Sequence, residues 1–201
     1  DGGLIVAIIS NAVTIADAGA FTASVGDLTL LNTATASSSA SLSFNSTYIN
    51  GDYQIYKFEF INIHPSVDNR IFSFNLSIDN GSNYNVTKTS TFFKANHGED
   101  DGGAALAYDG DYDLAQSTGV QALAEGVGND NDQATSGTFT LFNPSSTVFV
   151  KHFISNINTN RHVNANMNTF VAGYGNTTSA VNAIIFQMSS GNIDAGQIKL
   201  Y

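Results

Sequence analysis

The sequence contains no cysteine, two prolines and few charged residues. These shortages exclude several classes of protein. Without cysteine there is no disulfide, no thiol nucleophile and no thiolate metal ligand, so a disulfide-rich secreted scaffold is ruled out. Charged residues make up 12% of the 201 positions, about half the usual share. The net charge of −10 argues against nucleic-acid binding, which needs lysine and arginine to neutralise phosphates, and against docking on an anionic membrane.

Long apolar runs are also scarce. The run at residues 4–9 (LIVAII) is much shorter than the ~20 residues that a membrane-spanning helix needs, and no basic residue precedes it. We therefore expect a buried strand in this run, and we expect neither a signal peptide nor insertion into a membrane.

Small polar residues take the place of charged ones, with 21 serines, 18 threonines and 23 asparagines. These side chains favour strands and turns over helices. Apolar and polar residues alternate with period two in residues 53–63 and 71–78. In the second segment Phe72 and Phe74 share one face and Ser73 lies on the other, which is typical of a half-buried strand.

Turn signals separate such strands along the chain. In residues 79–83 (DNGSN) the Asn80-Gly81 pair supplies the positive φ angles of a tight hairpin. Residues 143–146 (NPSS) predict a second hairpin, and residues 189–196 (SSGNIDAG) predict a third at the end of the chain. Short strands with regular turn signals predict an all-β fold, specifically an antiparallel β-sandwich of jelly-roll type.

No break in composition divides the chain into two large domains. We predict a β-sandwich domain over residues 31–201 and an N-terminal arm or attachment segment over residues 1–30, where aromatic residues are fewer. Residues 120–127 predict one further strand. Residues 163–174 contain apolar residues at helical spacing, but the flanking asparagine and glycine favour an irregular strand.

Acidic residues are concentrated in one part of the chain. No lysine or arginine occurs between Lys94 and Lys151, and nine of the seventeen acids lie in this interval. Six of them fall in residues 97–113, HGEDDGGAALAYDGDYD. We interpret this stretch as the start of an exposed excursion from the sandwich, where loop-borne binding functions are commonly placed.

Asp109, Asp111 and Asp113 have the spacing that begins an EF-hand calcium loop. That pattern next requires glycine and then glutamate, where this chain has Leu114 and Val120, so the EF-hand match fails. A calcium site of another kind, built from these aspartates and loop carbonyls, stays open beside a simple solvated loop. No histidine pair has the spacing of a transition-metal site, so we predict no cofactor other than this Ca²⁺.

Tyrosines accompany the acidic stretch. Tyr108 and Tyr112 flank its glycines, and Tyr174 lies in a second glycine-containing segment. Tyrosine rings stack on sugar faces while Asp and Asn fix hydroxyl groups, so these three are candidate carbohydrate contacts. The alternative is that each ring packs against the domain or a neighbouring chain.

Signatures of catalysis are missing from the sequence. There is no G-x-S-x-G elbow, no P-loop and no dinucleotide fingerprint. Glycoside hydrolysis needs two opposed carboxyls, and nothing in the sequence pairs Glu59 with a second acid, whereas Lys57 two residues away offers it an ion pair. A histidine such as His152, alternating with apolar residues, is expected on a strand face in the core or an interface. We therefore predict that the protein is not an enzyme.

Several phrases resemble a family of tailed-bacteriophage virion proteins, common among marine phages and described as structural or tail-fibre-like. The resemblance runs from about Leu30 to Tyr201, and its most specific parts are the NPSS turn and the closing SSGNIDAGQIKLY. It implies a β-sandwich module on the virion surface, made in the host cytoplasm, oligomeric and bound to other virion proteins. It brings no catalytic residues, and the missing cysteine agrees with assembly in a reducing cytoplasm.

Three functions follow in order of preference. The first is a non-enzymatic virion structural protein, either a tail fibre or spike or a capsid decoration protein. It would form a homo-oligomer, most naturally a trimer, with attachment to a host surface glycan as a further role. The second is a lectin-like carbohydrate-binding module assisted by calcium. The third is a polysaccharide depolymerase.

Overall fold

The computed structural model describes residues 8–10, 13–17, 20–21 and 28–201. Every regular element in these ranges is a β-strand, and they contain no helix long and apolar enough to cross a membrane. The strands are β1 (Ile8–Ser10), β2 (Val13–Asp17), β3 (Ala20–Phe21), β4 (Asn32–Thr35), β5 (Ser41–Phe44), β6 (Ile55–Pro65), β7 (Arg70–Ser77), β8 (Lys88–Gly98), β9 (Ala105–Tyr108), β10 (Gln121–Val127), β11 (Thr135–Phe142), β12 (Lys151–Arg161), β13 (Ala165–Gly175), β14 (Ala183–Met188) and β15 (Ile193–Leu200).

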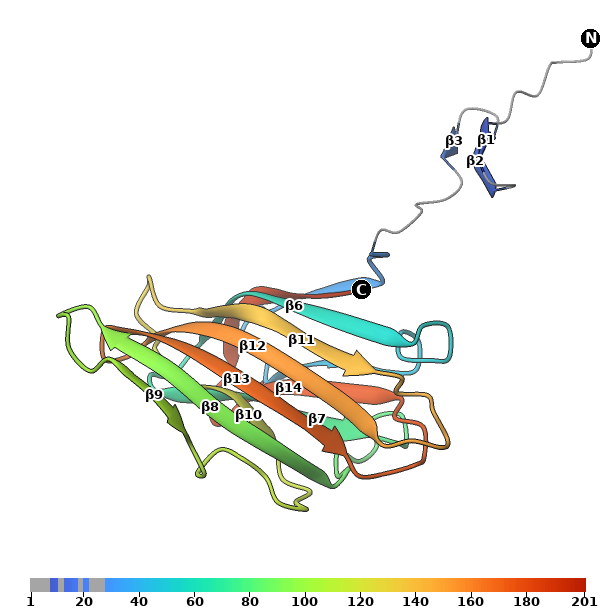
Figure 1. Ribbon diagram of the computed structural model, residues 1–201. Coiled ribbons are helices and arrows are strands. Elements are labelled where there is room, and N and C mark those ends of the chain that lie inside the picture. The colour runs from blue at the N-terminus through green and yellow to red at the C-terminus, as the bar shows by residue number, and fades with distance from the viewer. Residues whose placement is uncertain (1–7, 11–12, 18–19, 22–27) are drawn as a thin grey trace, which may run out of the picture.

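Twelve of these strands, β4 to β15, form one antiparallel sheet that curls into a nearly closed, barrel-like shape. Figure 1 shows β6, β11, β12, β13 and β8 side by side in front of β14 and β7. The order along the sheet is β4-β15-β6-β11-β12-β10-β7-β14-β5, and β12 also pairs with β13, which continues to β8 and β9. The prediction of an all-β, antiparallel fold is therefore confirmed.

A single pair of residues joins two long parts of this sheet. Strand β12 makes eleven consecutive pairs with β13, from Lys151 to Arg161, but meets β10 only where Arg161 pairs with Val127. The sheet therefore divides at this point into an eight-stranded part (β4-β15-β6-β11-β12-β13-β8-β9) and a four-stranded part (β10-β7-β14-β5).

The core lies between the inner faces of the two parts and is rich in phenylalanine. Phe186 on β14 is fully buried, and six phenylalanine rings surround it at centroid distances of 5.1–6.5 Å. They belong to Phe44, Phe58, Phe60, Phe72, Phe74 and Phe139. Each buried phenylalanine contributes roughly 1.5–3 kcal/mol through removal of apolar surface from water.

Local sequence patterns predicted most of the strands correctly, but two of the three predicted hairpins are wrong. Asn80 and Gly81 do adopt positive φ angles, 58° and 87°. Yet β7 pairs with β10 and β14, while β8 pairs with β13 and β9, so the turn crosses between the two parts of the sheet. The predicted terminal hairpin is wrong for the same reason, because β14 pairs with β5 and β7, and β15 with β4 and β6.

The other local predictions hold, except for the burial of β7. The NPSS turn does join two paired strands, β11 and β12. Residues 120–127 contain β10, and residues 163–174 contain β13, which is a regular rather than an irregular strand. Strand β7 was expected to be half-buried, but both of its faces are covered, because the Asn75 amide donates to carbonyls of Tyr84 and Thr118 in two overlying loops.

The predicted N-terminal arm, residues 1–30, lies partly outside the described residues. Within it, β1, β2 and β3 form a separate three-stranded antiparallel sheet. Of the apolar run at residues 4–9, only Ile8 and Ile9 are described, and they lie in β1.

Candidate functional site

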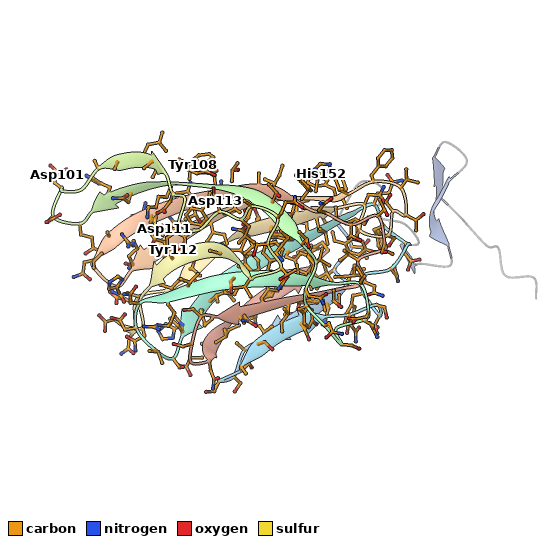
Figure 2. All side chains as sticks on the ribbon, turned by 90° about the horizontal axis from the view of Figure 1, so that it is seen from below. Asp101, Tyr108, Asp111, Tyr112, Asp113 and His152 are labelled. Atoms are coloured by element: carbon orange, nitrogen blue, oxygen red, sulfur yellow. The ribbon has the colours of Figure 1, made fainter. Side chains whose placement is uncertain are left out.

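The acidic stretch, residues 97–113, forms the end of β8, the whole of β9 and the turns around them. Strand β9 pairs only with β8, and all four of its residues are exposed. The turn before it is closed by a hydrogen bond from Gly98 N to Gly102 O of 2.7 Å. Figure 2 shows Asp101 at one end of the molecule and Tyr108, Asp111, Tyr112 and Asp113 further along, well separated from His152.

Asp109 belongs to an ion-pair cluster that the sequence did not reveal. Its Oδ2 lies 2.6 Å from Lys94 Nζ, which also contacts Glu125 Oε1. Arg161 Nη2 lies 3.7 Å from the same Glu125 oxygen. Two cations therefore balance two anions, and Glu125 is buried on β10. Gly126 shapes this corner, since its φ of +64° bends the strand and a Cβ there would lie 2.8 Å from Arg161 Nε.

The electrostatics of this cluster follow from burial and pairing. The hydrogen bond from Lys94 lowers the pKa of Asp109. Burial alone would lower the pKa of Lys94, but its hydrogen bonds to Asp109 and Glu125 outweigh burial and raise it. Burial, with the nearby Glu125, raises the pKa of Tyr112 to about 12. All three groups therefore keep their ordinary charge at neutral pH, so the cluster fastens the acidic stretch to β8 and β10.

Two of the three predicted metal ligands have side-chain partners other than a metal. Asp109 pairs with Lys94, and Asp113 accepts a hydrogen bond from the hydroxyl of Tyr108. The backbone N–H of Asp111 donates to Asp109 Oδ1 at 3.1 Å. Among the described residues no three His, Asp or Glu side chains gather as a metal site would require. Calcium binding by Asp109, Asp111 and Asp113 stays a prediction.

The three predicted sugar-contacting tyrosines do not form one site. Tyr112 points inward, with its ring 5.2 Å from that of the buried Phe92. Tyr108 is 58% exposed on β9 and pairs in register with Phe93. Tyr174 lies on β13 with its ring 6.2 Å from that of His152. Contact of these tyrosines with carbohydrate likewise stays a prediction.

The outer face of β11, β12, β13 and β8 gathers a different set of side chains. We call it the amide–aromatic face. Near its Lys151 end a hollow of about 480 Å³ opens over the small side chain of Ala172. Its wall includes the exposed side chains of Thr91, His152 and Ile154 and the half-buried side chains of Thr89 and Tyr174. His152 is exposed on a face of β12, so its predicted place on a strand face is confirmed. Of the two alternatives, burial in the core is wrong, and a place in an interface stays a prediction.

Asparagines fill the other end of this face. Asn156, Asn158 and Asn160 alternate along β12, and Asn166 and Asn168 face them from β13. Asn158 Nδ2 donates to Asn166 Oδ1 at 2.6 Å. A second hollow, of about 500 Å³, is lined by Ser136, Gly137, Thr138, Asn156, Asn158, Asn166 and Asn168.

An aromatic pair separates the two hollows. Phe93 on β8 and Phe170 on β13 are directly paired in register, and their rings stack at 4.9 Å with an interplanar angle of 13°. Phe93 remains 39% exposed. The residues that line the two hollows include no Asp, Glu, Lys or Arg. The alternation N-x-N-x-N at residues 156–160 is the sequence signal that would have indicated this face.

Two lysines are buried behind this face. Lys88 and Lys151 flank Gly175 in one row across β8, β13 and β12, and both are fully buried. Lys88 Nζ donates to Asn75 Oδ1 at 2.5 Å and to Val86 O at 2.8 Å. Lys151 Nζ donates to Phe149 O and Thr177 O, at 2.6 Å and 3.2 Å. Burial lowers the pKa of both, that of Lys88 to about 8.

Fold and surface together define an all-β antiparallel protein with a broad exposed sheet face. Comparison with known proteins finds no matching family model, no matching curated protein and no matching solved structure. Any functional assignment therefore depends on the sequence and on the geometry described above.

Proposed function

We propose that this protein is a non-enzymatic structural protein of a tailed-bacteriophage virion, displayed on the particle surface as a tail fibre, a spike or a capsid decoration. The observation that carries the proposal is the amide–aromatic face, a wide sheet surface with two hollows that are lined by hydroxyl, amide, imidazole and apolar groups and by no Asp, Glu, Lys or Arg. Such a face suits contact with a partner outside the particle better than burial inside the particle. The dense phenylalanine core provides a rigid framework for it.

The finer fold proposal is a jelly-roll sandwich, and the strand pairing supports it. A jelly roll is a long hairpin wound into two sheets, in which the first strand pairs with the last and the second with the second last. Here β4 pairs with β15, β5 with β14, β6 with β11, and β7 with β10. Strands β8, β9, β12 and β13 are then insertions that widen one sheet and create the amide–aromatic face.

Oligomerisation is part of the proposal, with a trimer as the expected form. Exposed apolar side chains at one end of the molecule support it. The loops at 50–54 and 143–150 lie together there, since Asn143 N donates to Gln54 O at 2.5 Å. Val148 and Phe149 on these loops are each 68% exposed. An apolar end of this kind suits contact with another copy or another virion protein.

Quantitative mass spectrometry of purified phage particles tests the proposal. The expected result is that the chain is present at a fixed copy number per particle, a small multiple of three for a fibre or spike and hundreds for a decoration protein. Sedimentation equilibrium of the purified chain should give three times the mass of 21.2 kDa. Absence of the chain from particles that infect normally would refute the assignment.

A further inference from the structure

We propose that the amide–aromatic face binds a neutral, unbranched polysaccharide, laid along β12 and β13. This inference extends the proposed function, because it names the chemistry that a surface-displayed protein would recognise on a host. It centres the binding site on β12 and β13 and not on the acidic stretch. Of the three predicted tyrosines, Tyr174 lines a hollow, Tyr108 lies beside the face in register with Phe93, and Tyr112 points inward.

The chemistry of the face matches that of a sugar. A pyranose presents apolar C–H faces, which stack on aromatic rings, and a rim of hydroxyl groups, which exchange hydrogen bonds with amides. The exposed edges of Phe93, Tyr174 and His152 offer the first kind of contact. The asparagines of β12 and β13 offer the second, and each amide carries both donors and an acceptor.

The charge of the face selects a neutral ligand. No Asp, Glu, Lys or Arg lines either hollow, and the chain as a whole carries a net charge of −10. An acidic polysaccharide would find no cation on this face and would be repelled by the overall charge. A carboxylate, that of Glu99, lines an adjoining hollow beside Asn158 and Asn166 at the edge of the face.

The shape of the face indicates a linear chain rather than a single sugar. The two hollows lie on the same side of β12 and β13, one on each side of the Phe93–Phe170 pair. Each of these strands has eleven residues and so extends about 35 Å. Asparagines at alternate positions repeat about every 6.7 Å along β12, which places a row of amides beside successive sugar units.

Affinity electrophoresis of the purified chain tests this inference. Native gels are cast with dextran, laminarin, mannan or agarose as neutral probes, and with alginate as the acidic probe. The acidic chain migrates freely in a plain gel, and we expect at least one neutral polysaccharide to retard it while alginate does not. The variants Tyr174→Ala and Asn158→Ala should each weaken that retardation roughly tenfold, because each removes one stacking or hydrogen-bonding group. The matched control Asn131→Ala, an exposed asparagine on the loop after β10, should leave it unchanged.

Each contrary outcome is specific. No retardation by any neutral probe, with the chain folded by circular dichroism, refutes the inference, as does retardation by alginate alone. Retardation that survives both substitutions places the site elsewhere. If Tyr174→Ala and Asn158→Ala instead dissociate an oligomer in sedimentation equilibrium, the face is covered by a second copy and the inference fails. None of these results bears on whether the chain is present in virions, which the particle measurement decides separately.

Discussion

The fully buried Lys88 provides a quantitative prediction about stability and pH. Its ammonium group has two oxygen acceptors, on Asn75 and Val86, and no carboxylate partner among the residues that the structure describes. Burial lowers its pKa from 10.5 to about 8. Replacement by methionine, Lys88→Met, keeps the length and removes the titrating group.

The magnitude follows from proton linkage. Between pH 8 and 10.5 the folded chain holds Lys88 neutral while the unfolded chain holds it protonated. Unfolding then takes up a proton, so the free energy of unfolding rises with pH across this window. A pKa that moves from 10.5 to about 8 corresponds to about 3 kcal/mol, so wild type should gain about that much relative to Lys88→Met between pH 7 and pH 10.5.

Urea denaturation at a series of pH values, followed by far-ultraviolet circular dichroism, measures this difference. All other titrating groups are common to both proteins, so their contributions cancel when the two curves are subtracted. The lost hydrogen bonds to Asn75 and Val86 shift the variant by a constant amount and leave the slope untouched. Two curves that run parallel from pH 7 to pH 10.5 would show that the Lys88 ammonium is solvated in the folded state.

Three further predictions concern the core and the ion-pair cluster. Phe186→Ala should lower the free energy of unfolding by about 3–5 kcal/mol in urea, because the cavity left among six phenylalanine rings has no neighbour able to fill it. Lys94→Met should cost about 3–5 kcal/mol by leaving the buried Glu125 without its closest cation, whereas Lys199→Met on the sheet surface should cost less than about 1 kcal/mol. The pKa of Asp109 lies below its usual 3.8, so the pairing of Asp109 with Lys94 stabilises the fold above pH 3.8 and is lost as the pH falls through the lowered value. Amide hydrogen exchange in β9 should therefore become faster under acid conditions.

The sequence predicts the strands far better than their partners. The alternation that includes Phe72 and Phe74 reflects only which side of the strand faces the core. A short stretch of sequence is enough to recognise it. Pairing in this sheet is non-local, because β4 pairs with β15 and β5 with β14, more than a hundred residues apart. A tight turn such as Asn80-Gly81 indicates a change of direction, and the strands it joins can go to the same part of the sheet or to different parts.

The candidate sites were hard to predict for a related reason. The sequence drew attention to charge, and so to the acidic stretch, whereas no Asp, Glu, Lys or Arg lines the two hollows of the amide–aromatic face. These hollows are assembled from four strands, β8, β11, β12 and β13, that a one-dimensional pattern does not place together. Asn156 and Asn166 line the same hollow only because of the register between β12 and β13. The repeated asparagines of β12 were visible in the sequence, but their meaning depended on the residues beside them.

The same contrast explains the acidic stretch itself. Its carboxylates look unbalanced along the chain, because no lysine or arginine lies between Lys94 and Lys151. In space, Lys94 at the border of this interval and Arg161 beyond it meet Glu125, and Lys94 also meets Asp109. Two of the nine acids are thereby neutralised where the stretch joins β8 and β10, which is where burial would penalise an unpaired charge most. Segregation of charge in the sequence therefore marks how this segment is held against the sheet.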